Sequence, residues 1–301
     1  MAGPPPAAPP TPGRRRPWPW VVAGAALVVV VVVIAAAVGL SDGDGGETTT
    51  DRTATTASPG AGTETTQPVA SGPPAAPAGV PEPVVEYFEA FAADDLAYMQ
   101  AVLDHAAEGS PAALYATHQI AVTRALGPDG VPTTVDVDDD TIVLRATATD
   151  PSGQEVELSA TFGDFEMDGD RLSTFTVDGV PLADRIRVGD PAGVSGNGVT
   201  VRIVTAYVTP RGDLWLNVDI ANTRGDVVEV ADYDWALVTP DGRQVDPSEN
   251  VCCPTAPSVG PGATAGHVVA FEQVGLGGTF QFVAFSEDFM TEIRLEVPVP
   301  G

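Results

Sequence analysis

The 301-residue sequence predicts a membrane-anchored, multi-domain protein: a single N-terminal transmembrane helix, an α+β unit and an all-β sandwich. Three observations carry this prediction. An uncharged run fills residues 21–40. From residue 83, apolar residues recur first at helical spacing and then in the alternation typical of strands. From residue 184 to the end, the alternation is interrupted only by turn residues. Since a domain takes about 150 residues, the length fits two folded units plus additional chain.

The composition is strongly acidic, and this excludes one class of partner. Asp and Glu number 41 against 14 Lys and Arg, which gives a net charge of −27. Such a surface repels phosphate backbones, so we expect no binding to nucleic acid.

The uncharged run is long enough to cross a lipid bilayer. Twenty residues at the helical rise span the hydrocarbon core, and the Val, Ile and Leu residues among them favour insertion by about 5 kcal/mol in total. Three arginines, Arg14 to Arg16, precede the run, and acidic residues follow it. The positive-inside rule therefore predicts a cytoplasmic tail (1–17), a membrane helix (18–40) and an extracytoplasmic remainder. A cleaved signal peptide is the alternative; we favour the anchor because the apolar run exceeds the usual length of a signal peptide.

Residues 41–82 predict a disordered linker. The segment is rich in Thr, Gly and Pro and has scarcely any large apolar side chain. It cannot bury enough apolar surface to offset the entropy of ordering. We expect a stalk that holds the folded units away from the membrane.

Residues 83–183 predict helices followed by an antiparallel sheet. The first helix covers residues 84–91, the second begins after Asp94 or Asp95, and the third runs from Ser110 to Gly127. Strands are expected over 135–137, 142–149, 156–162 and 172–177, with a hairpin turn at 168–169.

Residues 87–96 (YFEAFAADDL) resemble the opening of the nuclear-transport-factor-2-like fold, a cone of helices over a curved sheet. The resemblance implies a pocket used for binding or, in some members, for proton transfer. His118 is the best-placed candidate for such a pocket. A buried His that serves folding is the alternative, and we favour it because no partner carboxylate is identifiable. The helical face of His118 is shared by Leu114, Ala121, Val122 and Ala125.

Residues 184–301 predict a β-sandwich of about seven short strands. Four segments resemble telokin-like, immunoglobulin-like domains of unknown function found outside the membrane in Gram-positive bacteria. The segments are 215–222 (WLNVDIAN), 237–243 (LVTPDGR), 260–262 (GPG) and 266–271 (GHVVAF). The resemblance implies an extracytoplasmic accessory or binding module with no catalytic residues.

Trp215 is a candidate contact residue in this unit. Because it alternates with Leu214 and Leu216, its side chain is expected to face away from the sandwich core. An outward Trp marks either a contact surface or a site covered by a loop or by the first unit, and we favour the covered site.

Cys252 and Cys253 are adjacent, and an exported location permits their oxidation. Neighbouring Cα atoms lie about 3.8 Å apart, less than the usual minimum of about 4.4 Å, so a bond between them would be strained. A vicinal disulfide, free thiols and an intermolecular bridge all remain open, with the vicinal bond slightly preferred.

The functional expectation is a membrane-anchored, non-enzymatic binding or accessory protein of the bacterial cell envelope. The chain contains no recognisable nucleophile motif, metal-ligand cluster or nucleotide loop, so no catalytic residue, metal or cofactor is expected. The expected partners are the bilayer, through residues 18–40, and an envelope component or membrane protein. The alternatives are a ligand-binding sensor or accessory subunit with a pocket in residues 83–183 and, third, a small-substrate enzyme.

Overall fold

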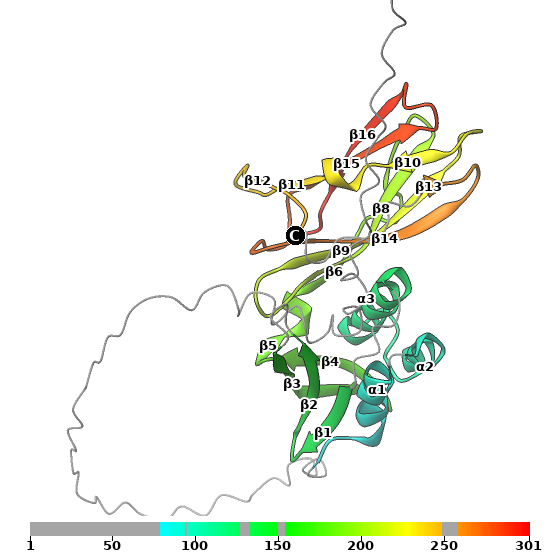
Figure 1. Cartoon of the computed structure of the whole chain (residues 1–301). Coiled ribbons are helices and arrows are strands. Elements are labelled where there is room, and N and C mark those ends of the chain that lie inside the picture. Colours follow the sequence, from blue (N-terminus) through cyan, green and yellow to red (C-terminus); the bar gives the residue numbers. More distant parts are fainter. Residues whose placement is uncertain (1–78, 94, 127–132, 150–153, 249–257) are drawn as a thin grey trace, which may run out of the picture.

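The computed structural model describes residues 79–93, 95–126, 133–149, 154–248 and 258–301. The predicted membrane segment, residues 41–78 of the predicted linker and Cys252–Cys253 lie outside these residues; α1 begins at Glu82, the last residue of the predicted linker. No helix in the described part of the chain is long and apolar enough to cross a membrane. The described residues form a few helices and antiparallel sheets, followed by a β-rich region, in agreement with the predicted order (Figure 1).

Three α-helices open the described chain, and two begin at the predicted caps. They are α1 (Glu82–Ala92), α2 (Leu96–Ala101), which continues into the short helix η3 (Val102–Asp104), and α3 (Pro111–Leu126). The Asp95 carboxylate accepts hydrogen bonds from the backbone N–H groups of Ala97 and Tyr98, at 2.8 and 3.1 Å. Ser110 Oγ accepts one from Ala113 N at 3.2 Å. These side chains satisfy N–H groups that the first turn of a helix leaves unpaired.

A sheet with strand order β1-β2-β3-β4-β5 follows. The predicted hairpin turn at residues 168–169 connects β3 and β4. The predicted end of β3 is wrong, because the strand continues beyond Phe162 and its pairing register shifts between Gly163 and Met167. The bounds are β1 (Thr133–Asp138), β2 (Thr141–Thr149), β3 (Glu155–Asp168), β4 (Arg171–Val177) and β5 (Val180–Pro181).

Aromatic rings fill the space between the helices and this sheet. Phe88 lies at the centre, with its ring centroid 4.4 Å from that of Phe162 and 5.4 Å from that of Phe175. We call this set the ring cluster: Tyr87, Phe88, Phe91, Tyr115, Phe162 and Phe175, all buried. Edge-to-face ring pairs of this kind stabilise a core beyond the area that they bury.

The remaining strands form two sheets around a separate apolar core. The inner sheet, which faces the helices, has the order β14-β9-β8-β6, and β7 also pairs with β8. The outer sheet has the order β12-β11-β15-β10-β13, and β16 pairs with β15. The connection to the first sheet includes the short helix η4 (Leu182–Asp184), and η5 (Asp232–Asp234) separates β10 from β11. The bounds are β6 (Ile186–Val188), β7 (Val194–Gly196), β8 (Val199–Val208), β9 (Leu214–Asn222), β10 (Val228–Val230), β11 (Ala236–Val238), β12 (Gln244–Val245), β13 (Ser258–Val259), β14 (Thr264–Phe271), β15 (Thr279–Ser286) and β16 (Glu292–Pro298).

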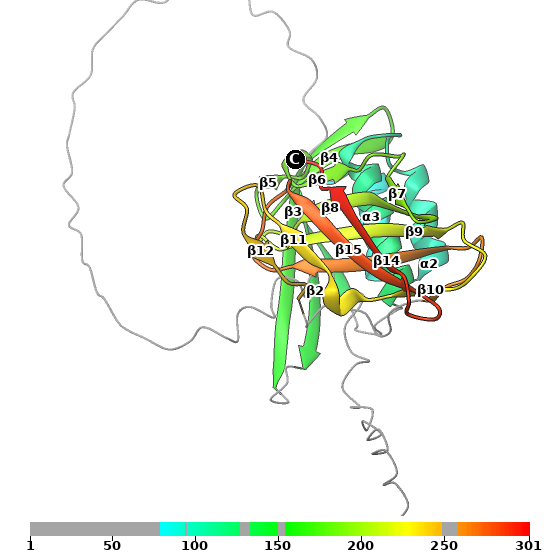
Figure 2. The same ribbon diagram turned by 90° about the horizontal axis from the view of Figure 1, so that it is seen from above.

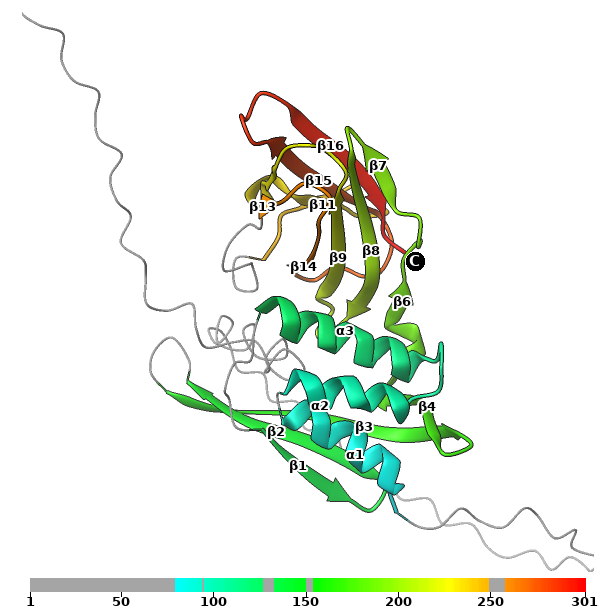
Figure 3. The same ribbon diagram turned by 90° about the vertical axis from the view of Figure 1, so that its right-hand side faces the viewer.

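Helix α3 lies between the first sheet and the inner sheet of the sandwich (Figure 3). Seen from above, strands of the inner sheet cross over it (Figure 2). Tyr115 on α3 belongs to the ring cluster, whereas Val122 packs with Trp215 of β9. One helix therefore contributes side chains to two separate apolar clusters.

Candidate functional site

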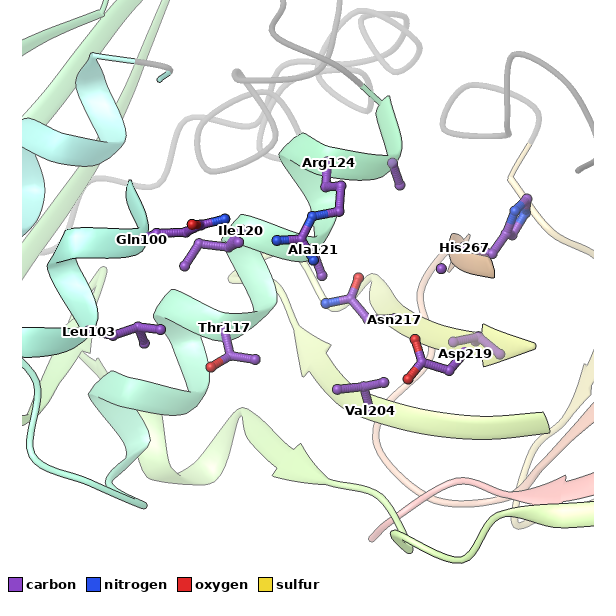
Figure 4. Close-up of a pocket in the computed structure, with 13 residues that line it drawn as sticks. Gln100, Leu103, Thr117, Ile120, Ala121, Arg124, Val204, Asn217, Asp219 and His267 are labelled. Atoms are coloured by element: carbon purple, nitrogen blue, oxygen red, sulfur yellow. The ribbon is translucent and has the colours of Figure 1, made fainter. Parts of the chain in front are cut away.

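A pocket of about 600 Å³ opens where α2 and α3 meet the inner sheet (Figure 4). Gln100 and Leu103 enter it from the α2–η3 segment, and Arg124 enters it from α3. Strand β9 contributes Asn217 and Asp219. The other lining residues are Thr117, Ile120, Ala121, Ala125, Val204, Val218, Gly266 and His267. The volume is within the range of ligand sites in proteins, and the mixture of apolar side chains with a few polar groups is typical of them.

A buried polar cluster joins α3 to the inner sheet beside this pocket. His118 Nδ1 lies 2.9 Å from Thr205 Oγ1 and 3.0 Å from Asn217 Nδ2. Asn217 Nδ2 also donates to the backbone oxygen of His118 at 3.0 Å and to Thr205 Oγ1 at 2.9 Å. All three residues are buried, and we call them the junction triad: His118, Thr205 and Asn217. Their hydrogen bonds connect positions that are 87 and 99 residues apart in the sequence.

The geometry of the junction triad favours a neutral His118. Because Asn217 Nδ2 can only donate, His118 Nδ1 accepts and the ring proton resides on Nε2. Burial lowers the pKa of His118 to about 3, so the ring is uncharged at neutral pH. A base with so low a pKa is poorly suited to proton transfer near neutrality. His118 therefore acts as a hydrogen-bonding element between α3 and the inner sheet.

Trp215 lies on the same face of the inner sheet as Asn217 of the junction triad. It is 2 % exposed and packs with Val122 of α3 and with Val268 and Ala270 of β14. Its neighbours in the strand, Leu214 and Leu216, belong instead to the sandwich core. The structure thus covers the outward-facing Trp with a helix that precedes the sandwich.

Several polar atoms at this interface have no hydrogen-bond partner among the described residues. They are His118 Nε2, Trp215 Nε1 and Asn217 Oδ1, each with almost no accessible surface. Buried polar groups are usually paired, and unpaired ones are concentrated where a ligand, a water molecule or strain is involved. Of the three residues, Asn217 lines the pocket.

The charges around the pocket are unevenly balanced. Asp219 forms an ion pair with Arg202 of β8. Arg124, in contrast, takes part in none of the ion pairs found within the described ranges. Burial lowers the pKa of His267 to about 4, so its ring is neutral, and the ring centroid lies 4.7 Å from that of Trp235. Among the described residues, Arg124 is therefore the charged side chain of the lining that has no ion-pair partner.

The site differs from the sequence expectation in its location. A pocket was expected within residues 83–183, between helices and sheet, where the ring cluster lies. The pocket described here instead takes its lining from that unit and from the sandwich together. His118 and Trp215, the two contact candidates, both lie at this junction, whereas Cys252 and Cys253 lie outside the described residues. Across the described part of the chain, no group of three or more His, Cys, Asp or Glu side chains could hold a metal ion.

Sequence reasoning missed Thr205, Asn217 and Arg124. The outward-facing Trp215 was a signal for the first two residues. Asn217 follows Trp215 on the same face of β9, and Thr205 of β8 is paired in register with Asn217. Nothing in the local pattern of α3 distinguishes Arg124 from an ordinary solvated arginine.

No protein-family model matches this chain, and the search of curated proteins returned no match. Among solved structures, the chain is similar to one titled "X-ray structure of Northeast Structural Genomics Consortium target SoR45". The two are 13% identical, the alignment covers 39% of this chain and 86% of the solved chain, and the TM-score is 0.23. A likeness at that score supports no conclusion about fold or function. The observed two-sheet region is sandwich-like and compatible with the immunoglobulin-like resemblance of residues 184–301.

Proposed function

We propose that this chain is a membrane-anchored, extracytoplasmic binding protein of the bacterial cell envelope. In this proposal the segment 18–40 anchors the protein and the segment 41–82 is a stalk. The immunoglobulin-like sandwich and the helices together present the pocket between α3 and the inner sheet, which we call the junction pocket, to an envelope component. The pocket between α3 and the inner sheet is the observation that carries the proposal. The same pocket would serve a sensor or accessory subunit equally well.

The chemistry of the pocket supports binding over catalysis. A general acid or base needs a pKa near the working pH and a partner within hydrogen-bond reach. His118 and His267 both have strongly lowered pKa values, at about 3 and about 4. Their hydrogen-bond and ring contacts are those of structural residues. The pocket nevertheless combines apolar side chains with a cation and two amides, a combination suited to holding a small polar ligand.

The sequence supports the proposed extracytoplasmic location of the folded units. Arginines precede the apolar run and acidic residues follow it, which predicts export of everything after residue 41. Tags at residue 5 and after residue 301 test this orientation when protease is added to intact cells. We expect loss of the C-terminal tag alone. Loss of the N-terminal tag alone would contradict the orientation, and complete recovery of the protein in the medium would indicate cleavage.

Photo-crosslinking in intact cells tests binding at the pocket. A benzophenone amino acid replaces Leu103, which lines the pocket, and in a control chain it replaces the exposed Met290 on the β15–β16 turn. We expect a discrete adduct from position 103 and none from position 290. The adduct should disappear when Ala121→Trp fills the pocket. Equal adducts at both positions, or an adduct that Ala121→Trp leaves unchanged, would overturn the proposal.

A further inference from the structure

We infer that the junction pocket binds a ligand that carries a carboxylate beside an N–H donor, the chemistry shared by a free amino acid and the C-terminal residue of a peptide. This inference rests on the proposed function, because it specifies what the same pocket holds. Three features of the lining lead to it: a cation and a buried acceptor that have no partner among the described residues, and an apolar wall.

The cation is Arg124. It takes part in no ion pair among the described residues, in a chain whose net charge is −27. The neighbouring carboxylate, Asp219, is neutralised by Arg202 and does not cancel it. A guanidinium group binds a carboxylate with two parallel hydrogen bonds, and this geometry makes Arg the usual carboxylate ligand in proteins. The pocket therefore favours an anion over a cation.

The acceptor is the side-chain oxygen of Asn217. The two N–H bonds of the amide nitrogen are shared among three nearby atoms, His118 Nδ1 and the His118 backbone oxygen on α3 and Thr205 Oγ1 on β8. These contacts fix the amide orientation and leave Oδ1 without a partner among the described residues. Asn217 lines the pocket together with Arg124 (Figure 4). Because the asparagine is 2 % exposed, a donor on the ligand would satisfy a group that has little access to water.

The apolar wall comes from three elements. Leu103 lies on η3, Ile120 on α3 and Val204 on β8, and all three line the pocket. An aliphatic side chain placed among them would bury apolar surface. A phosphate or another small inorganic anion would engage Arg124 but would bring neither the N–H group nor the apolar group. The combined lining thus fits an amino-acid unit with a free carboxylate and an aliphatic side chain.

Isothermal titration of the full chain, purified in detergent, tests this inference with three probes. The probes are N-acetyl-Ala-Leu with a free carboxylate, the same dipeptide with an amidated C-terminus, and free leucine. We expect amidation to weaken binding by about tenfold or more, because it removes the charge that pairs with Arg124. Tighter binding of the acetylated dipeptide identifies a peptide end as the ligand, and tighter binding of leucine identifies a free amino acid.

Matched variants locate the binding. Arg124→Gln should weaken binding of the free-carboxylate probe by about tenfold or more, and Arg124→Lys, which keeps the charge but loses the paired geometry, should have a smaller effect. Arg171→Gln, at an exposed arginine on the β3–β4 hairpin, should leave affinity unchanged. Circular dichroism spectra that match the wild type confirm that each variant folds.

The remaining outcomes separate this inference from the proposed function. Equal affinity for the acid and the amide, or binding that Arg124→Gln leaves unchanged, would overturn the carboxylate site. If no probe binds while the crosslinked adduct at position 103 persists, the ligand class is wrong and the proposed function stands. If no probe binds and no adduct forms, both fail.

Discussion

The two sides of α3 are packed by different chemistry. On the side of the first sheet, the ring cluster brings six aromatic side chains together, and most of the ring pairs meet edge to face. On the side of the inner sheet, the contact consists of the junction triad, the covered Trp215 and an open pocket. The first interface is closed and apolar, whereas the second contains buried polar atoms that have no partner within the described ranges. The difference indicates that the first side is packed as a closed core, whereas the second combines packing with buried polar groups and an open pocket.

The largest effect is expected in the ring cluster. Phe88→Ala removes a fully buried ring at its centre and should lower the free energy of unfolding by about 3–5 kcal/mol. Urea unfolding of the full chain measures the change. Tyr98→Ala, at an exposed ring on α2, is the matched control and should change stability little. A small effect of Phe88→Ala would show that the first interface is not closely packed.

A smaller loss is expected in the junction triad. His118→Ala removes a buried ring and leaves Asn217 and Thr205 with fewer hydrogen bonds, so we expect a loss of about 2–3 kcal/mol. The same urea titration measures it. If the variant unfolded like the wild type but lost the crosslinked adduct at position 103, His118 would be a ligand-binding residue, and the comparison drawn here would be wrong.

The pH dependence of stability sharpens the comparison, because the junction contains a buried His and the ring cluster contains none. The unfolded chain takes up a proton on His118 below about pH 6.5, whereas in the folded protein burial lowers its pKa to about 3. The contribution of His118 to the free energy of unfolding is therefore fully present above pH 6.5. It falls by about 1.4 kcal/mol per pH unit as the pH decreases toward 3. Burial also raises the pKa of the adjacent Tyr207, so that phenol stays neutral in this range.

Comparison with His118→Gln isolates this contribution from that of the many carboxylates. Urea midpoints of the wild type and the variant should converge as the pH is lowered from about 6 to 4. A constant difference between the two chains would mean that His118 is accessible to protons in the folded state.

The smallest effect is expected from a comparison of substitutions at two buried tryptophans. Trp235 Nε1 donates to the backbone oxygen of Val283 at 3.0 Å, whereas Trp215 Nε1 has no partner among the described residues. Both substitutions to Phe remove a similar volume, but only Trp235→Phe removes a hydrogen bond. We expect it to cost about 1 kcal/mol more than Trp215→Phe in thermal or urea unfolding. Equal costs would indicate that Trp215 Nε1 is bonded in solution.

Much of the local structure could be predicted from the sequence, because caps, turns and periodicity are local signals. Asp95 and Ser110 cap their helices as expected, and the turn at 168–169 connects the predicted strands. The continuation of β3 past Phe162 was missed, because the bulge that follows breaks the strict alternation.

The site could be predicted only in part. His118 and Trp215 were identified one at a time, from a helical face and from strand alternation. Their neighbourhood depends on contacts between residues 87 to 99 positions apart, which no local pattern encodes. The pairing of Asn217 with His118, and the exposure of Arg124 at the pocket, follow from how α3 lies on the inner sheet.

The position of α3 has a consequence for cooperativity. Since Tyr115 and Val122 on one helix belong to the apolar clusters on its two sides, neither side can lose the helix without exposing buried surface on the other. A fragment that begins after α3 would expose Trp215, Val268 and Ala270 to water. The described residues should therefore melt in a single calorimetric transition, with equal calorimetric and van't Hoff enthalpies, although they contain two separate cores.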